Sequence, residues 1–265
     1  MNGHSLDVVM TPERTKEGEF VWTVPDGWQQ GRGAFGGIVV GALLRAIQQV
    51  ETDPGRAVRS VTAELVGPVV PGPARLQVEV LRRGNAVTTV RAWLSQSDDE
   101  ILAHAVVVLG SSRPGTPAWS YPKPELPALV PPVDMPRGVA PVFAQHFEYR
   151  PTGPYPFTGH ASAEAAGYVR TRAEATRFDA AYVAAHADAY WLAAMATFDQ
   201  PRPAATVAFT LHLQDPLDAE SAAAPLFHRA TSLSSVGGYA SETRELFTSS
   251  GRLLALNHQL IAIIK

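Results

Sequence analysis

The segment from Trp28 to Ile47, WQQGRGAFGGIVVGALLRAI, joins a glycine-rich turn to an apolar helix that has almost no charged face. Between Ile38 and Ile47 the only charged residue is Arg45. Such a helix is poorly suited to a surface with one side in water, so other parts of the chain must cover most of its sides. The segment therefore favours folds in which a helix is wrapped, and strands that curve around it would do this.

The turn in this segment is also suited to contact a ligand. Its glycines, which include Gly36 and Gly37, let another group approach the backbone closely. The first N–H groups of a helix lack partners within it and lie at the positive end of its dipole, so they attract a phosphate, a carboxylate or a developing oxyanion. We therefore take Phe35, Gly36 and Gly37 as candidate substrate-binding residues. The alternative is a buried helix entered through a flexible turn.

Composition excludes several classes of function. The chain has 265 residues, of which 46% are hydrophobic, enough for one large or two small cores. A formal net charge of -3 without a run of Lys and Arg argues against a nucleic-acid surface. With no cysteine, there is no thiolate nucleophile, disulfide or Cys-ligated metal. The first residues include charges and no long apolar core, which indicates neither a signal peptide nor a membrane anchor and favours the cytoplasm.

Repeated prolines between Ser111 and Pro141 divide the chain, because proline prevents a regular helix and interrupts a sheet ladder. We interpret this stretch as a linker. The predicted organisation is an N-terminal domain over residues 1–110, a Pro-rich linker over 111–141 and a C-terminal domain over 142–265.

The two halves repeat one order of elements. In the first half, a strand over Glu19–Val24 and the helix precede four strand-like segments, with hairpin turns at Gly84–Asn85 and Asp98–Asp99. The second half has two strands, a helix from about Phe178 to Thr197 and four more strands. The other expected strands are 59–66, 74–84, 86–97, 100–110, 146–151, 166–173, 205–213, 225–236, 239–250 and 252–264. A duplicated α+β unit explains this order, and two unrelated α+β domains in tandem are the alternative.

The segment WQQGRGAFGGIVVGALLRAI, followed by RSVTAELVGPVVPG, resembles the N-terminal half of the thioesterase-like superfamily that includes the acyl-CoA thioesterase II, or TesB-type, enzymes. The likeness is strongest over residues 20–110 and weaker over 140–265, where GRLLALNHQL still resembles the family's last hairpin. The resemblance implies an α+β double hotdog, in which two fused hotdog domains each wrap a long helix in a curved antiparallel sheet. We expect two separate sheets, pressed together at a seam that admits an acyl thioester of coenzyme A.

The resemblance implies a site at the contact of the two halves, where an Asp, a Ser or Thr, and a Gln orient and activate water. The Gln corresponds to Gln259 in LNHQLI. Thr231 fits best as the hydroxyl residue, with Ser232 and Ser234 as alternatives. The aspartate has no match, because Ala208 stands at its position. Its absence matters, since loss of a general base typically costs about a hundredfold to ten-thousandfold in rate.

Asp188, in the predicted helix AAYVAAHADAYWLAAM, is the candidate replacement. Its neighbours are mostly apolar, and burial among them would raise its pKa towards the range that suits a base near neutral pH. The alternative, given equal weight, is a structural carboxylate that hydrogen-bonds backbone or a partner strand. His186 lies two positions earlier on the helix and therefore points in a different direction, so a joint role is not favoured.

Other polar residues are weaker candidates. His258 precedes Gln259 and so faces the other side of its strand. Glu64, on the same strand face as Thr62, could supply a carboxylate from the first half, although an exposed strand glutamate is the commoner situation. The histidines lack metal-ligand spacing, and the chain has no nucleophile elbow, phosphate loop, dinucleotide fingerprint or hydratase signature. We expect no metal and no cofactor.

The sequence thus predicts an acyl-CoA thioesterase of lipid metabolism, which hydrolyses a small-molecule acyl-CoA with Gln259, Thr231 and Asp188 as catalytic residues. A hotdog protein that binds an acyl thioester or a lipid-like ligand without hydrolysis is the main alternative, because of Ala208. A hydratase or other acyl-CoA lyase comes third. No nucleic acid or membrane partner is expected, and a homodimer is possible.

Overall fold

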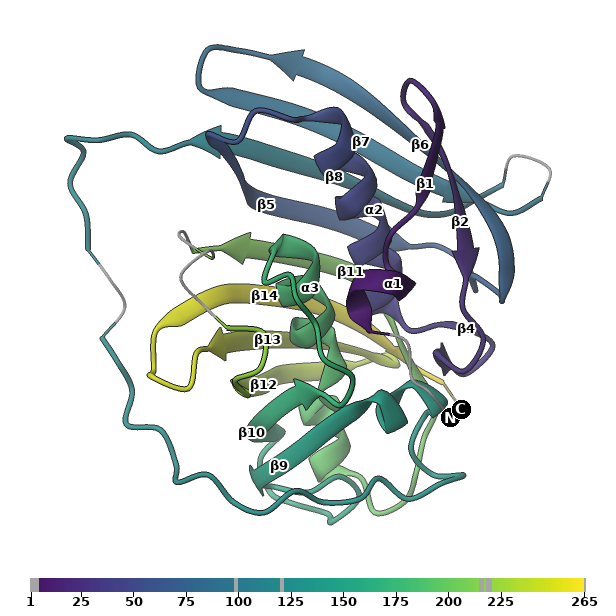
Figure 1. The fold of residues 1–265 in the computed structure, drawn as a ribbon. Coiled ribbons are helices and arrows are strands. Elements are labelled where there is room, and N and C mark those ends of the chain that lie inside the picture. Colours follow the sequence, from purple (N-terminus) through teal and green to yellow (C-terminus); the bar gives the residue numbers. More distant parts are fainter. Residues whose placement is uncertain (1–4, 98–99, 120–121, 215–216, 218–220, 265) are drawn as a thin grey trace.

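The computed structural model describes residues 5–97, 100–119, 122–214, 217 and 221–264. Two halves of similar architecture lie one above the other, with the N-terminal half in purple to blue and the C-terminal half in green to yellow (Figure 1). The elements of the N-terminal half are α1 (Leu6–Val9), β1 (Glu13–Lys16), β2 (Glu19–Val24), β3 (Gln29–Gln30), β4 (Gly33–Ala34), α2 (Gly36–Val50), β5 (Arg56–Leu65), β6 (Gly72–Arg83), β7 (Val87–Ser95) and β8 (Ile101–Ser111).

The C-terminal half repeats the main helix and the strands around it, with two short 3-10 helices, η1 and η2, added. Its elements are η1 (Val142–His146), β9 (Phe147–Gly153), β10 (Glu164–Thr171), α3 (Ala180–Ala189), η2 (Ala193–Thr197), β11 (Ala204–Leu213), β12 (Leu226–Val236), β13 (Tyr239–Phe247) and β14 (Leu253–Ile263). The expected strand over Glu19–Val24 is found with those bounds, and the other expected strands are present with ends that differ by a few residues, whereas β1, β3 and β4 were not predicted.

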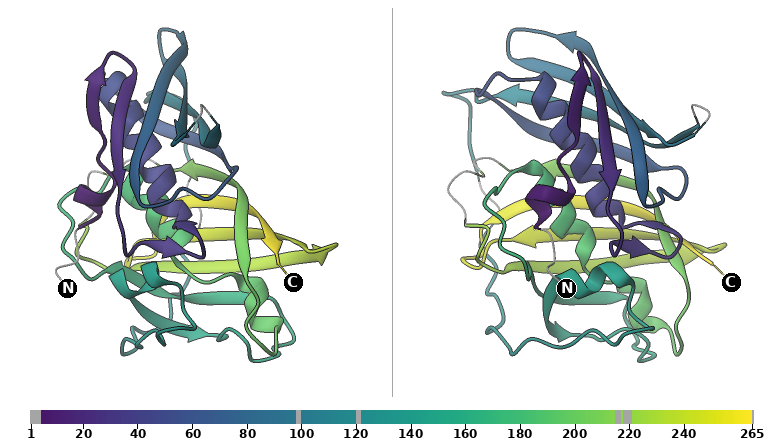
Figure 2. Two further views of the ribbon diagram at one scale, coloured as in Figure 1. Left: turned by 90° about the vertical axis from the view of Figure 1, so that its right-hand side faces the viewer. Right: turned by 45° about the vertical axis from the view of Figure 1, so that its right-hand side comes forward.

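The described strands form one sheet of twelve, in the order β1-β2-β6-β7-β8-β5-β11-β14-β13-β12-β10-β9, besides the small β3–β4 hairpin. The prediction of two separate sheets is wrong in this respect. Strands β5 and β11, one from each half, pair antiparallel, with Thr62 opposite Thr210, and this pairing joins two six-stranded half-sheets edge to edge. Each half-sheet still curves around its own helix (Figure 2), so the double hotdog fold is confirmed.

Helix α2 is covered as its sequence predicts, since every residue from Gly36 to Ile47 is buried. Helix α3 is buried along its whole length. The two helices pack against each other and run in opposite directions. Near one end of the contact Gly37 lies against Ala185, and at the other Arg45 Nε lies 3.4 Å from Asp179 Oδ2. The start of α2 is therefore next to the end of α3.

The second helix is shorter than expected. It ends at Ala189 rather than near Thr197, because Tyr190 has an extended backbone conformation and the chain resumes only as the short helix η2. A side chain from the sheet stabilises this new start, since Glu242 Oε2 accepts a hydrogen bond from the Ala193 N–H at 2.8 Å. The break leaves Asp188 in the last turn of α3, where its side chain reaches beyond the helix.

The described part of residues 112–141 forms no helix or strand, apart from isolated bridges at Val133 and between Arg137 and Ala140. Strand β8 includes Ser111, the first residue of the predicted linker. Of the two predicted hairpin turns, Gly84–Asn85 joins β6 to β7, whereas Asp98–Asp99 lies outside the described residues. None of the described helices is both long enough and apolar enough to span a membrane.

Candidate active site

A buried polar cluster lies where the start of α2, the end of α3 and the inner face of strands β11, β13 and β14 meet. Asp188 contributes the carboxylate, and 8% of this residue is exposed to solvent. Gln259 on β14 donates from Nε2 to Asp188 Oδ1 at 2.9 Å. The Gly37 N–H, in the first turn of α2, also donates to the Asp188 carboxylate. The structure thus brings together three of the residues singled out in the sequence, two from the C-terminal half and one from the N-terminal half.

Hydrogen bonds fix the Gln259 side chain in one orientation. Its Oε1 accepts from Thr206 Oγ1 at 2.7 Å, and its Nε2 donates to Asn257 Oδ1 at 2.9 Å as well as to Asp188. Asn257 is itself held, because its Nδ2 donates to the carbonyl oxygen of Thr210 at 2.8 Å. Both ends of the Gln259 amide are therefore committed to the protein, and its N–H group is directed at the carboxylate.

An arginine and a glutamate from β13 complete the cluster. Arg244 is 1% exposed, and its Nη1 lies 3.9 Å from Asp188 Oδ1. The closer partners of the guanidinium are Glu242 Oε1, which accepts from Nε at 2.7 Å, and the carbonyl oxygen of Ala187, which accepts from Nη1 at 2.9 Å. Arg244 thus lies beside Asp188 while its own charge is balanced at closer range by Glu242.

Burial raises the pKa of Asp188 above its ordinary value, because a carboxylate is disfavoured away from water. The Arg244 charge and the hydrogen bonds from Gln259 and Gly37 oppose this effect only in part. A carboxyl group with a raised pKa next to fixed hydrogen-bond donors is suited to accept a proton from water.

The glycine turn brings the backbone of α2 within contact distance of this carboxylate. A β-carbon on Gly36 would lie 2.8 Å from Asp188 Oδ2 and 2.7 Å from Leu65 Cδ1, so any larger residue there must displace one or both of these side chains. The Gly36 N–H has no backbone acceptor among the described residues. Phe35 does not face open solvent, because it is fully buried and its ring stacks on Phe143 of η1 at 4.0 Å between centroids.

Thr231 is not brought to this cluster. Across the sheet, Thr231 lies opposite Thr243, and Thr243 lies opposite His258. Gln259 belongs to the neighbouring row, in which it lies opposite Glu242, and Glu242 lies opposite Ser232. Residues directly opposite each other share a sheet face, so this register puts Thr231 on the face opposite to Gln259. The hydroxyl that contacts Gln259 comes instead from Thr206, next to an irregularity in the register of β11.

Ala208 and Glu64 also lie on the outer face of the sheet. They are opposite each other in the β5–β11 pair, and Ala208 also lies opposite Leu260, one residue after Gln259. The Glu64 carboxylate is 3.0 Å from His104 Nε2 at the surface. A carboxylate at position 208 of this chain would therefore face away from Gln259, and the structure offers Asp188 in its place.

His186 is fully buried, but it takes part in a different set of contacts. Its Nδ1 lies 2.9 Å from the Tyr182 carbonyl oxygen, and its ring meets Phe147 edge-on. Burial lowers its pKa to about 4, so it is neutral near pH 7. No group of three or more His, Asp or Glu residues in the described part of the chain could hold a metal ion.

The polar cluster has no counterpart in the N-terminal half. The two half-sheets are related about the Thr62–Thr210 pair, so equivalent positions can be identified from the strand register. The positions of Gln259, Asn257, Arg244 and Glu242 correspond to Val107, Ala105, Ala92 and Val90, all fully buried. Counted from the N-cap of each helix, Leu44 occupies the position in α2 that Asp188 occupies in α3. The chain therefore has one polar site and one apolar equivalent.

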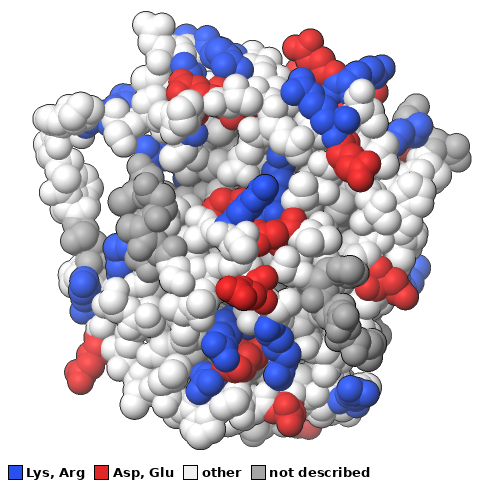
Figure 3. Space-filling model, viewed as in Figure 1, with Lys and Arg blue, Asp and Glu red and all other residues white. Residues whose placement is uncertain are grey.

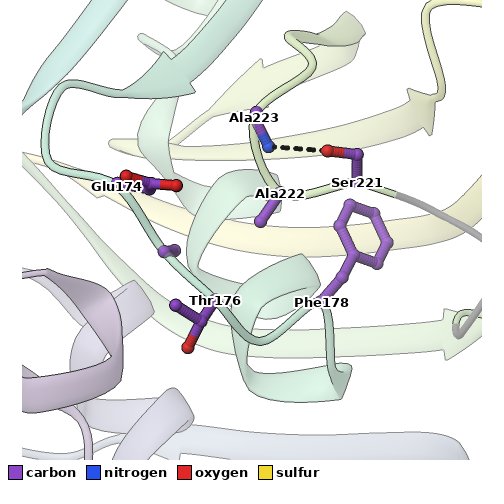
Figure 4. A pocket seen from close by; sticks show the side chains of 7 residues that line it. Glu174, Thr176, Phe178, Ser221, Ala222 and Ala223 are labelled. Atoms are coloured by element: carbon purple, nitrogen blue, oxygen red, sulfur yellow. Dashed lines mark hydrogen bonds between the residues drawn. The ribbon is translucent and has the colours of Figure 1, made fainter.

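Two cavities lie away from the cluster. One, of about 450 Å³, is lined by residues that precede α3 and β12, including Glu174, Thr176 and Ser221 (Figure 4). It adjoins the start of α3, where the chain's own Asp179 caps the helix by accepting from the Tyr182 N–H. The other, of about 520 Å³, lies near Arg59 and Gly110. On the face seen in Figure 3, acidic and basic side chains are interspersed.

Sequence reasoning missed four members of the cluster: Thr206, Asn257, Arg244 and Glu242. A usable signal was present in two of these strands. Glu242 and Arg244 alternate in SETREL, and Asn257 and Gln259 alternate in LNHQLI, which places each pair on one strand face. Polar residues at alternate positions of a strand, on the face expected to meet a buried helix, indicate a polar site in the core.

Family comparisons match both halves of the chain. The model of the acyl-CoA thioesterase N-terminal domain matches residues 24–110, and that of the acyl-CoA thioesterase C-terminal domain matches residues 125–263. The chain belongs to the acyl-CoA thioesterase family. This membership confirms the resemblance to TesB-type enzymes and supports thioester hydrolysis as the general activity. No curated protein sequence matches the chain.

Solved structures share the fold of this thioesterase family member over almost its whole length. A hotdog-fold protein of unknown function from Alicyclobacillus acidocaldarius has a TM-score of 0.88 at 21% identity, with 99% of each chain covered. The acyl-CoA thioesterase II TesB2 from Mycobacterium marinum has a TM-score of 0.76, and a TesB protein from Mycobacterium avium subs paratuberculosis has 0.77. Each of these two is 19% identical, with 98% of both chains covered.

Proposed function

We propose that this thioesterase family member hydrolyses a small-molecule acyl-CoA to the free acid and coenzyme A, with Asp188 as the general base. The observation that carries the proposal is the contact between a buried carboxylate and the start of α2, at the junction of the two halves. Asp188 is held there by Gln259 and by the Gly37 N–H. The ion pair between Asp188 and Arg244 is long, at 3.9 Å, so the carboxylate is held without a hydrogen bond from the guanidinium, which suits a base.

The proposed reaction is a single displacement through a tetrahedral intermediate. Asp188 takes a proton from water as the water oxygen bonds to the thioester carbon. The carbonyl oxygen gains negative charge, and we assign its stabilisation to the N–H of Gly36, which has no backbone acceptor in the described part of the chain. The C–S bond then breaks, the thiolate of coenzyme A leaves, and the proton returns from Asp188 to the thiolate or to solvent.

The proposal modifies the roles expected for some residues. Gly37 already donates to Asp188, so we assign it to holding the base and keep Gly36 for the substrate. Gln259 orients the carboxylate rather than water, because both ends of its amide are engaged. Leu65 must move aside to admit the thioester next to Gly36, since its side chain fills that space. The role of Thr231, the homodimer and the cytoplasmic location stay predictions.

Release of free thiol from a panel of acyl-CoA substrates tests the proposal. We expect the wild-type chain to release coenzyme A, and Asp188→Asn to lose about a hundredfold to ten-thousandfold in kcat. Gln259→Ala should also lower kcat, because the carboxylate then loses one of its fixed donors. Glu64→Gln is the matched control, since Glu64 is a carboxylate on the outer face of the sheet.

Three other results would change the assignment. Full activity in Asp188→Asn would remove Asp188 as the base. Loss of activity in Glu64→Gln but not in Asp188→Asn would move the base to the outer face. Stabilisation of the fold by acyl-CoA in a thermal-shift titration, without thiol release from any member of the panel, would favour the alternative of a protein that binds the thioester and does not hydrolyse it.

A further inference from the structure

Three buried ionisable side chains lie in series on one side of the candidate site. Glu242 is 2% exposed and Arg244 is 1% exposed, and Asp188 follows on the other side of the guanidinium. Both carboxylate oxygens of Glu242 are engaged, one with Arg244 Nε at 2.7 Å and one with the Ala193 N–H at 2.8 Å. This arrangement is costly to bury, so it calls for an explanation beyond stability.

The geometry separates the roles of the two acids. Glu242 takes the close, charge-assisted hydrogen bond from Arg244, whereas Asp188 is left at 3.9 Å from Nη1, beyond hydrogen-bond distance. Nη1 is itself occupied by the Ala187 carbonyl oxygen, which belongs to the residue just before Asp188. Arg244 Nη2 has no partner among the described residues. The guanidinium is thus held from both sides at a fixed distance from Asp188.

We propose that Glu242 and Arg244 are positioning residues for Asp188: Glu242 restrains the guanidinium so that it supports the carboxylate across 3.9 Å without donating a hydrogen bond to it. This inference rests on the proposed function of Asp188 as a base. If Arg244 bonded Asp188 directly, the carboxylate would be a weak proton acceptor. If Arg244 were absent, the carboxyl group would stay protonated to a higher pH, because burial would act almost unopposed.

The other titratable groups around the Asp188 carboxylate carry no charge near neutral pH, so they do not oppose the effect of Glu242 and Arg244 on its protonation. His228 on β12 and His186 on α3 have pKa values lowered by burial, so both are neutral. Tyr149 on β9 and Tyr190 at the end of α3 have pKa values raised by burial, so both stay protonated. Arg244 and Glu242 are therefore the charged groups that set the protonation of Asp188.

Opposite substitutions test the proposal through the pH profile of kcat/KM. Glu242→Gln removes a negative charge and leaves the guanidinium free to attract Asp188, so the acid limb should move to lower pH, by about one pH unit. Arg244→Gln removes the positive charge, so the limb should move to higher pH by a similar amount. Glu245→Gln is the matched control, because Glu245 is on the same strand as Glu242 but pairs with Arg229 of β12 at 2.6 Å, outside the cluster. It should leave the limb in place.

A second measurement does not depend on turnover. The γ-carboxyl resonance of Asp188 can be followed by NMR in protein with ¹³C-labelled aspartate, and it is assigned by its loss in Asp188→Asn. The titration midpoint should move in the same two directions as the kinetic limb. If the wild-type chain hydrolyses no acyl-CoA, the proposed function fails, but these midpoints still test the control of Asp188 by the pair.

The proposal is overturned if Glu242→Gln leaves the Asp188 midpoint unchanged or moves it upwards, or if Glu245→Gln moves it equally. Arg244→Lys serves if Arg244→Gln does not fold, as judged by its thermal unfolding. The lysine keeps the charge but loses the fork that joins Glu242 to Ala187, so it should restore the midpoint only in part.

Discussion

Asp188, in the last turn of α3, accepts a hydrogen bond from the backbone N–H of Gly37, in the first turn of α2. The two residues come from different halves of the chain, so this bond exists only when the halves are assembled. It also places a carboxylate at the positive end of a helix dipole, which favours the ionised form that a base requires.

The two glycines at this helix start should respond differently to substitution. In Gly36→Ala the new methyl meets the ends of two side chains, Leu65 and Asp188, which can move. In Gly37→Ala it meets the Ala185 backbone at 2.9 Å and the Phe35 ring, so the helices must separate. We expect Gly37→Ala to lower the free energy of unfolding by about 1–3 kcal/mol and Gly36→Ala to lower it less.

Activity should show a clear loss in Gly36→Ala, because the methyl displaces the carboxylate and fills the space needed by the thioester. Chemical denaturation and thiol release, measured on both variants, check this pair of outcomes. Gly110→Ala is a control with ordinary contacts, at 3.4 Å from Arg59 Cγ. Wild-type turnover in a well-folded Gly36→Ala protein would exclude the start of α2 as the substrate site.

Substitutions of two threonines distinguish the site that the structure indicates from the site that the family resemblance implies. Thr206→Val leaves Gln259 Oε1 without its donor at 2.7 Å, so Gln259 is less firmly held against Asp188. We expect kcat/KM to fall about tenfold, which corresponds to about 1.4 kcal/mol of transition-state stabilisation. Thr231→Val alters the opposite face of the sheet and should have a smaller effect. A larger loss of kcat/KM in Thr231→Val than in Thr206→Val would favour Thr231 as the catalytic hydroxyl residue, as the resemblance implies.

The buried histidine of α3 should make the fold sensitive to acid. The pKa of His186 is lowered to about 4 in the folded chain, whereas an unfolded histidine has its ordinary value of 6.5. The unfolded state therefore binds the proton first as the pH falls, and stability that is complete above pH 6.5 is lost progressively down to about pH 4. This loss amounts to about 3–4 kcal/mol, at 1.4 kcal/mol per pKa unit.

His186→Leu removes the titrating group at similar volume. Its free energy of unfolding should vary less than that of the wild type between pH 6.5 and pH 4, as measured by urea denaturation across that range. His228, whose pKa is also lowered, continues to titrate in the variant and leaves part of the slope. Parallel curves for the two proteins would mean that His186 is protonated without unfolding.

Local patterns in the sequence predicted the strands and the burial of α2, because both depend on periodicity that neighbouring residues carry. The length of α3 was not predictable in this way. The helical pattern continues through Tyr190 towards Thr197, but the Glu242 carboxylate, from a distant strand, stabilises a new start at Ala193. Asp188 lies at a helix end for this reason, and only the folded chain reveals it.

Only part of the site was predictable from the sequence, for a similar reason. Gln259 and Asp188 were each identified from the sequence, but their contact depends on how β14 lies against α3. The face of Thr231 depends on its register across β13, which the sequence does not specify. The edge pairing of β5 with β11 joins strands from different halves, so a prediction of each half by itself left the sheets separate.

The apolar equivalents at Val107, Ala105, Ala92 and Val90 have a consequence for how this chain can change. One half carries the polar groups of the candidate site, whereas the equivalent positions of the other half carry only apolar side chains that pack in the core. The apolar half is constrained by volume and shape alone at those positions. It can therefore exchange one aliphatic side chain for another of similar volume, whereas a replacement at Gln259 or Arg244 would break a hydrogen bond of the buried cluster.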